Sequence, residues 1–128
     1  MVCRTGKLGG NLKLNNETYE LGKLVTQMLE KKKTVKVDVL DVHELTPLAD
    51  LFVIVVGSNV RQTQSLADDI EELVKEQGIE VHKEGYHTAT WILLDCGEMI
   101  VHVLEQQHAT FYGLERLWKD APMIAYTE

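Results

Sequence analysis

Residues 84–118, EGYHTATWILLDCGEMIVHVLEQQHATFYGLERLW, decide the fold, because this stretch reads as strand, tight turn, strand and short helix. Two apolar runs in it, 91–95 and 99–104, are each long enough for a strand. Cys96-Gly97 lies between them and supplies a residue free to take positive φ, so a β-hairpin is predicted. Apolar residues then recur at helical spacing and predict a short amphipathic helix: Phe111, Leu114, Leu117 and Trp118.

The size and composition of the chain indicate one globular domain. Its 128 residues can bury a core without disulfides or metal, and residues 1–16 are expected to be a flexible arm before a domain at 17–128. No apolar run approaches the roughly 20 residues of a membrane span, and no signal peptide is recognisable. The two cysteines, Cys3 and Cys96, are far apart, which favours a reducing compartment. We therefore expect a cytoplasmic protein.

The formal net charge of −7 is unevenly distributed. Up to Lys36, eight basic and three acidic residues give a balance of +5, whereas from Val37 onward five basic and seventeen acidic residues give −12. Phosphate backbones repel carboxylates, so most of the chain is poorly suited to bind nucleic acid directly. It is suited to a basic protein surface, whose field would steer association. The simpler alternative is that the acidity only keeps the protein soluble.

The remaining elements follow from periodicity, caps and breakers. Thr18 and either Ser58 or Asn59 are expected to cap two helices, and Gly78 is expected to end the second. The pattern predicts helices at 18–33 and 58–77, and further strands at 35–42, 51–56 and 79–82. This order predicts an α/β domain with a single mixed β-sheet and helices packed on its faces.

The turn at Gly57-Ser58 raises the hypothesis of an enzyme. It follows a predicted buried strand and precedes a helix, where free N–H groups could bind a nucleotide phosphate. Nucleotidyltransferases use Gly-Ser at such a turn, but they also need a strand-borne carboxylate pair to hold Mg²⁺. The next close pair, Asp68-Asp69, falls within a helix, where adjacent side chains point about 100° apart. We therefore expect no enzyme and no catalytic residue, and interpret Ser58 as a helix cap.

The histidines and cysteines do not predict a metal site. No pair of them has the spacing of zinc ligands, so we expect neither a metal nor a cofactor. His102 lies on a predicted strand and is expected to be partly buried and bonded to a neighbour. Cys96 lies near Asp95 and Glu98, whose charges would raise the pKa of the thiol and disfavour a nucleophile.

Several short motifs follow one another in a recognisable order. They are Glu84-Gly85, a Trp-led strand from Trp91 to Asp95, Val101-His102, and Tyr112-x-Leu114-Glu115-x-Leu117-Trp118. Upstream lie Asp41, the run 50–54, Gly57-Ser58 and Arg61-Gln62. In these motifs, over roughly 19–122, the chain resembles the ribosomal silencing factor family, also called the Iojap-like family. Ala109 departs from the pattern, which usually places Arg three residues before the Tyr.

The resemblance implies a compact sheet related to the nucleotidyltransferase fold. It also implies a protein that binds the large ribosomal subunit through ribosomal protein number fourteen, blocks association with the small subunit and represses translation. Two alternatives remain open: an assembly factor for the large subunit that uses the same surface, and a small nucleotidyltransferase-like enzyme. Family members often self-associate, so a homodimer is expected, and no membrane partner is.

Trp91 can belong to the core or to an interface. A Trp that opens a strand is often packed inside, but Trp is also enriched at binding hot spots. In the family the corresponding Trp belongs to the surface that docks on the ribosomal protein, so we expect an interface role. The expected docking surface comprises Glu84, Gly85, Trp91, Leu93, Asp95 and Met99.

Overall fold

The computed structural model describes residues 16–107 and 119–124. Within them lie two helices, α1 (Asn16–Glu30) and α2 (Val60–Glu76), and five strands. The strands are β2 (Lys36–Asp41), β3 (Leu51–Gly57), β4 (His82–Glu84), β5 (Trp91–Asp95) and β6 (Met99–Glu105). The helix predicted from the apolar stripe at 111–118, and all but the last residue of the predicted arm, lie outside the described residues.

The five strands form one mixed sheet in the order β2-β3-β6-β5-β4. The central pair, β3 and β6, is parallel, while the other neighbours are antiparallel. Every residue of β3 and of β6 is buried, as expected for strands covered on both faces. The prediction of an α/β domain with a single mixed sheet is therefore confirmed.

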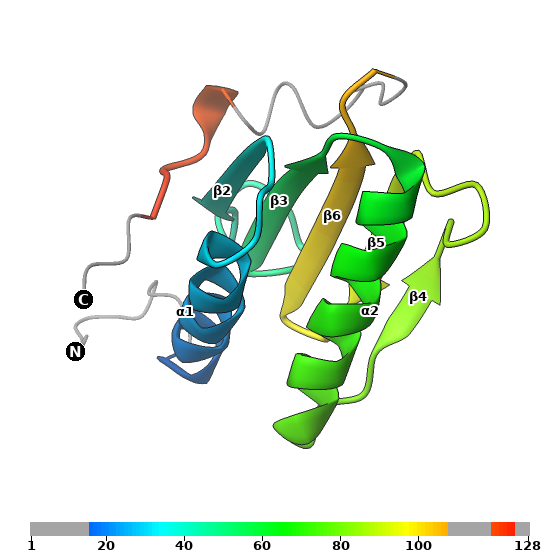
Figure 1. Ribbon diagram of the computed structural model, residues 1–128. Coiled ribbons are helices and arrows are strands. Elements are labelled where there is room, and N and C mark those ends of the chain that lie inside the picture. The colour runs from blue at the N-terminus through cyan, green and yellow to red at the C-terminus, as the bar shows by residue number, and fades with distance from the viewer. Residues whose placement is uncertain (1–15, 108–118, 125–128) are drawn as a thin grey trace.

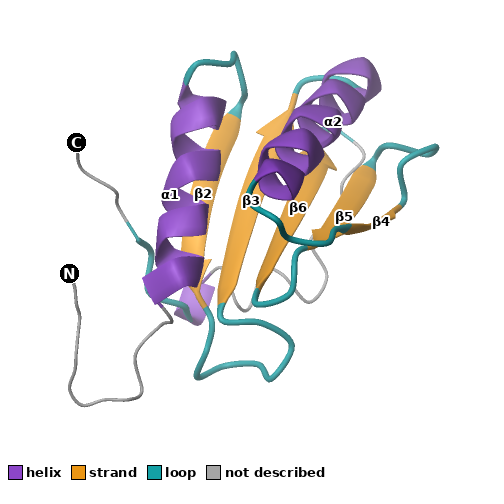
Figure 2. Ribbon diagram, turned by 90° about the horizontal axis from the view of Figure 1, so that it is seen from below, coloured by secondary structure: helices purple, strands orange, loops and turns teal. Residues whose placement is uncertain are grey.

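Both described helices pack on the same face of the sheet, which Figures 1 and 2 show from two directions. The first two of the predicted flanking helices are thus observed, as α1 and α2. Alternate residues of each strand point to opposite sides, so the core has two parts. The helix-side part includes Val25 of α1, Ile70 of α2 and Val53 of β3. The part on the opposite side includes Phe52, Ile54 and Leu104.

Of the two predicted helix caps, the one at Ser58 or Asn59 is observed and the one at Thr18 is not. Asn59 caps α2, because its side chain accepts a hydrogen bond from the backbone N–H of Gln62 at 2.9 Å. Ser58 is therefore not the cap, and its hydroxyl instead donates to the Gln62 side chain at 3.1 Å. Thr18, predicted to cap the first helix, lies within α1 and is buried. None of the helices in the described residues is long and apolar enough to span a bilayer.

The predicted β5–β6 hairpin is confirmed. The chain reverses at Gly97 and Glu98, where the backbone N–H of Cys96 donates to the Met99 carbonyl at 2.8 Å. Gly97 has a φ of +87°, which glycine adopts without strain, and Asp95 accepts a hydrogen bond from its N–H. The predicted short strand at 79–82 is shifted along the chain and is observed as β4.

Candidate docking surface

The edge strand β4 and its neighbour β5 carry most of the expected docking residues on one side of the sheet. Glu84 of β4 pairs with Leu93 of β5, and facing residues of neighbouring strands share a side of the sheet. Leu93 shares that side with Trp91 and Asp95, two positions away in each direction. We name this set of residues the β4–β5 face: Glu84, Trp91, Leu93 and Asp95, together with His82, which pairs with Asp95. Its residues are partly or fully exposed.

The β4–β5 face lies opposite the helices. Ile92 and Leu94, which alternate with its residues along β5, are fully buried in the helix-side core. Trp91 and Leu93 instead pack at the margin of the opposite part of the core. The face therefore combines two apolar side chains with the carboxylates of Glu84 and Asp95. His82 is a residue that the sequence interpretation missed, although its place at the end of a short strand before Glu84 could have indicated it.

Met99 does not belong to this face. It is fully buried, and its side chain lies in the helix-side core with Cys96 and Leu94. The expectation that Met99 contributes to a docking surface is therefore wrong. The reason is strand alternation: Asp95 pairs with Ile100, so the residue next to Ile100 points to the other side of the sheet.

Gly85 has a structural role beside the β4–β5 face. Its φ is +78°, and a Cβ atom added there would lie 2.3 Å from the backbone oxygen of Trp91. Real Cβ atoms do not approach an oxygen so closely, so only glycine fits without a shift of the backbone. Gly85 thus lets the chain leaving β4 pass against the start of β5, where Trp91 is held.

The indole of Trp91 is hydrogen-bonded to the buried side chain of His102. Its Nε1–H donates to Nδ1 of His102 at 3.1 Å, and the centroids of the two rings are 5.9 Å apart. His102 is only 4% exposed and also meets the ring of Phe52 edge-on at 4.7 Å. The prediction that His102 is a polar residue bonded to a neighbour is confirmed, and it is more deeply buried than expected. Burial lowers its pKa to about 4.

Because of His102, the stability of the protein is expected to fall with pH between 6.5 and 4. In this window the unfolded chain binds a proton that the folded protein excludes, so acidification favours unfolding. From pH 7 to pH 5.5 the loss should be about 1 kcal/mol. Urea denaturation of the natural protein and of His102→Leu at both pH values measures this loss of unfolding free energy. The variant has no imidazole at this position, so its stability should lack the contribution of His102 to the pH dependence. An identical pH dependence in the two proteins would contradict the assignment.

Helix α2 fastens the loop that leads into β5. The buried hydroxyl of Thr63 donates to the Ala89 carbonyl at 2.7 Å, and the Gln64 amide donates to the Tyr86 carbonyl at 2.9 Å. The hydroxyl of Tyr86 donates to Asp68 at 2.9 Å, which raises the pKa of the phenol. Ala89 has a φ of +65°, a conformation that costs a residue other than glycine free energy. These contacts hold a strained loop in one place, and sequence periodicity gave no signal of them.

The turn at Gly57-Ser58 is in contact with side chains from the first turn of α2. The backbone N–H of Ser58 already donates to Oε1 of Gln62 at 2.7 Å. The space beside Gly57 is filled, since a Cβ there would lie 3.1 Å from Thr63 and 3.2 Å from Gln62. Two of the N–H groups at this turn are thus engaged by side chains: that of Ser58 by Gln62, and that of Gln62 by Asn59.

The two carboxylates of Asp68-Asp69 serve different neighbours. Asp69 forms an ion pair with Lys32 at 2.6 Å, whereas Asp68 accepts from Tyr86. Their divergence agrees with the prediction that adjacent helix residues cannot hold one Mg²⁺ together. Within residues 16–107 and 119–124, no group of three or more His, Cys, Asp or Glu side chains is placed to hold a metal ion.

Cys96 is buried in the helix-side core. Burial, with a smaller contribution from the charge of Asp95, raises the pKa of its thiol to about 12. The direction agrees with the prediction, but the main cause is loss of hydration and not the acidic neighbours. A thiol with this pKa is a poor nucleophile at neutral pH.

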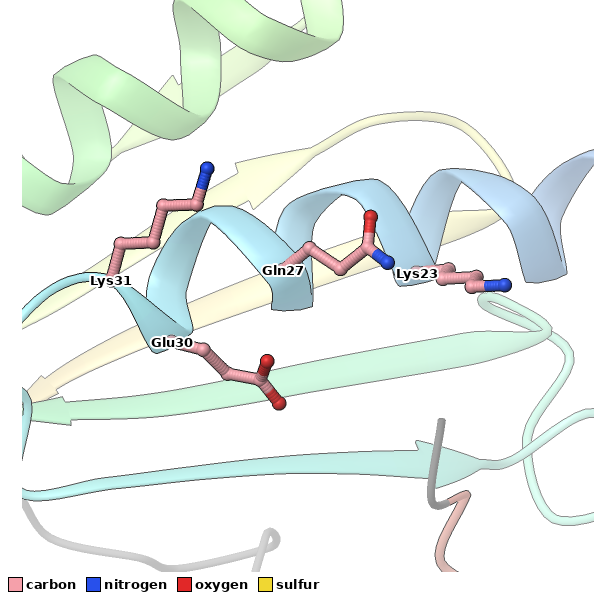
Figure 3. A pocket seen from close by; sticks show the side chains of 4 residues that line it. All are labelled: Lys23, Gln27, Glu30 and Lys31. Atoms are coloured by element: carbon pink, nitrogen blue, oxygen red, sulfur yellow. The ribbon is translucent and has the colours of Figure 1, made fainter. Parts of the chain in front are cut away.

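An open depression of about 580 Å³ lies along α1. Its lining comes from α1 and the residue that follows it, and Figure 3 shows the four side chains: Lys23, Gln27, Glu30 and Lys31. Ligand sites usually enclose a ligand with apolar walls and a few converging polar groups. An open depression lined by four polar side chains from one segment of the chain does not have this character.

The described part of the chain is therefore an α/β domain with a partly apolar, acidic face on the side of the sheet away from α1 and α2. The family model described as "Ribosomal silencing factor during starvation" matches residues 15–128, and the chain belongs to this family. This membership confirms the resemblance found in the sequence motifs. The family's members are named as regulatory factors and not as enzymes.

Individual relatives support the same family. A protein of Halalkalibacterium halodurans named Ribosomal silencing factor RsfS is 37% identical over 106 residues, covering 82% of this chain and 91% of its own. The Bacillus subtilis protein of that name is 35% identical over 102 residues, covering 79% and 86%. An X-ray crystal structure of a Chromobacterium violaceum protein matches with a TM-score of 0.72 and 31% identity, covering 85% and 92%.

Proposed function

We propose that this protein binds the large ribosomal subunit through ribosomal protein number fourteen and blocks its association with the small subunit, so that translation in the cytoplasm is repressed. Membership in the ribosomal silencing factor family supports the ribosome as the target. The observation that carries the proposal is the β4–β5 face, where Trp91 and Leu93 share one side of the sheet with the carboxylates of Glu84 and Asp95.

Repression in this proposal is steric. No bond is broken, and the effect depends on occupying a surface that the small subunit also needs. The acidic chain, with a net charge of −7, would be steered toward a basic protein surface. The partly exposed indole of Trp91 then sets the residence time, because interface aromatics that become desolvated govern dissociation.

The proposal extends to the fold and the free protein. We place the mixed sheet among nucleotidyltransferase-like folds without the chemistry, since fold kinship does not confer activity. We also propose a homodimer in the absence of ribosomes, formed through the surface that docks. Sedimentation equilibrium of the natural protein and of Trp91→Ala measures this, because loss of Trp91 should shift the protein toward the monomer.

Co-sedimentation with separated ribosomal subunits tests the proposed function. The protein should pellet with isolated 50S subunits and not with 30S subunits, and pre-loading it on 50S should reduce the formation of joined ribosomes. Binding to both subunits alike, or to neither, contradicts the proposal. Binding to 50S without any effect on joining would favour a role in large-subunit assembly.

A further inference from the structure

His102 occupies a position in the sheet where a polar side chain is unexpected. It lies in the middle of β6, paired with Ile54 on one side and Leu93 on the other, and only 4% of it is exposed. The ring is packed edge-on against Phe52, with ring centroids 4.7 Å apart. Trp91 is the neighbour to which it is hydrogen-bonded, at 3.1 Å.

The direction of this hydrogen bond fixes the proton on the imidazole. An indole Nε1–H can only donate, so Nδ1 of His102 must accept and carries no hydrogen. The hydrogen of the neutral ring is then on Nε2. That nitrogen is buried and has no hydrogen-bond partner among the described residues.

Folding stability alone does not explain this histidine. A buried N–H without a partner costs free energy, and an apolar side chain of similar volume would avoid that cost. What leucine cannot do is accept a hydrogen bond from Trp91. The same bond fixes the rotation of a side chain that is only partly covered, and a side chain fixed in advance loses less entropy when a partner binds.

We propose that His102 is a positioning residue that holds the indole of Trp91 in one orientation on the β4–β5 face, ready for a protein partner. This role rests on the proposed docking function of Trp91. His102 is itself buried beneath the face, so it acts through Trp91 and does not touch the partner.

Two substitutions at one position separate positioning from packing. His102→Leu fills the space and removes the acceptor, whereas His102→Asn keeps an acceptor, because its Oδ1 is attached to Cγ as Nδ1 is in histidine. The first readout needs no ribosome: hydrogen exchange of the Trp91 indole N–H, followed by NMR and assigned by its loss in Trp91→Phe. The second readout is the dissociation constant for isolated 50S subunits.

We expect His102→Leu to fold and to exchange its indole hydrogen at least tenfold faster. It should bind 50S about three- to tenfold more weakly, and His102→Asn should restore most of both losses. Unchanged exchange in His102→Leu would overturn the positioning role. Faster exchange with undiminished binding would overturn it too, because the orientation would then be irrelevant to docking. If the natural protein itself does not bind 50S, the proposed function fails. The exchange measurement needs no ribosome, so it still tests separately whether His102 holds the indole of Trp91.

Discussion

Replacing Trp91 with alanine is expected to weaken binding to isolated 50S subunits by about 30-fold or more. A desolvated aromatic anchor typically contributes about 2 kcal/mol or more to an interface, and each 1.4 kcal/mol corresponds to a factor of ten. Trp91 is partly exposed on the face away from both described helices, so most of this loss should appear in binding. The measurement is a dissociation constant by co-sedimentation, taken alongside a melting curve.

Met99→Ala supplies the matched comparison. Met99 is fully buried on the other side of the sheet, so its truncation should cost about 2–5 kcal/mol of stability through the cavity it leaves. At a temperature where Met99→Ala remains folded, its affinity for 50S should equal that of the natural protein. If Trp91→Ala melts as early as Met99→Ala, or binds 50S normally, the docking surface has been placed wrongly.

Gly85→Ala is expected to lower the free energy of unfolding by about 3 kcal/mol or more. Two causes add here. An L residue at positive φ costs about 1–2 kcal/mol, and relieving an overpacked contact costs typically about 1–3 kcal/mol. The contact is severe, because the new Cβ would meet the backbone oxygen of Trp91 at 2.3 Å and a backbone atom cannot swing aside. Urea denaturation measures the loss.

Gly97→Ala separates the two causes. Gly97 has a similar φ of +87°, but no atom lies within 4 Å of the Cβ that would be added. This variant should therefore show the conformational cost alone, about 1–2 kcal/mol. Equal losses in the two variants would mean that the close approach of Gly85 to β5 is not maintained in solution.

The sequence was informative where one local rule decided the outcome. The run 51–56 was recognised as a buried strand because both faces of β3 are covered, which removes the usual alternation. The hairpin around Gly97 follows from a glycine that lies between two apolar runs, each long enough for a strand. The starts of helices follow less directly from the sequence, since Thr18, Ser58 and Asn59 are all acceptable caps by residue type, and backbone geometry selects Asn59 for α2.

The site could be predicted only in part, because it depends on which side of the sheet each residue faces. Trp91, Leu93 and Asp95 alternate along one strand, so their shared side follows from the sequence once β5 is known. Met99 lies across a turn, and its side follows from the pairing register of β5 with β6. The partnership of Trp91 with His102 depends on the same register and could not be read from either strand alone.

The parallel pairing at the centre of the sheet has a consequence for the order of folding. Leu51 of β3 pairs with Met99 of β6, 48 positions later in the chain, whereas β5 and β6 are joined by a tight turn. Closing the loop between β3 and β6 costs chain entropy that their contacts offset only once the strands have paired. The hairpin of β5 and β6 closes a much shorter loop, so it is expected to form before β3 joins the sheet. We therefore expect β5, which bears Trp91, to pair with β6 early in folding. The burial of His102 is completed only when β3 pairs with β6.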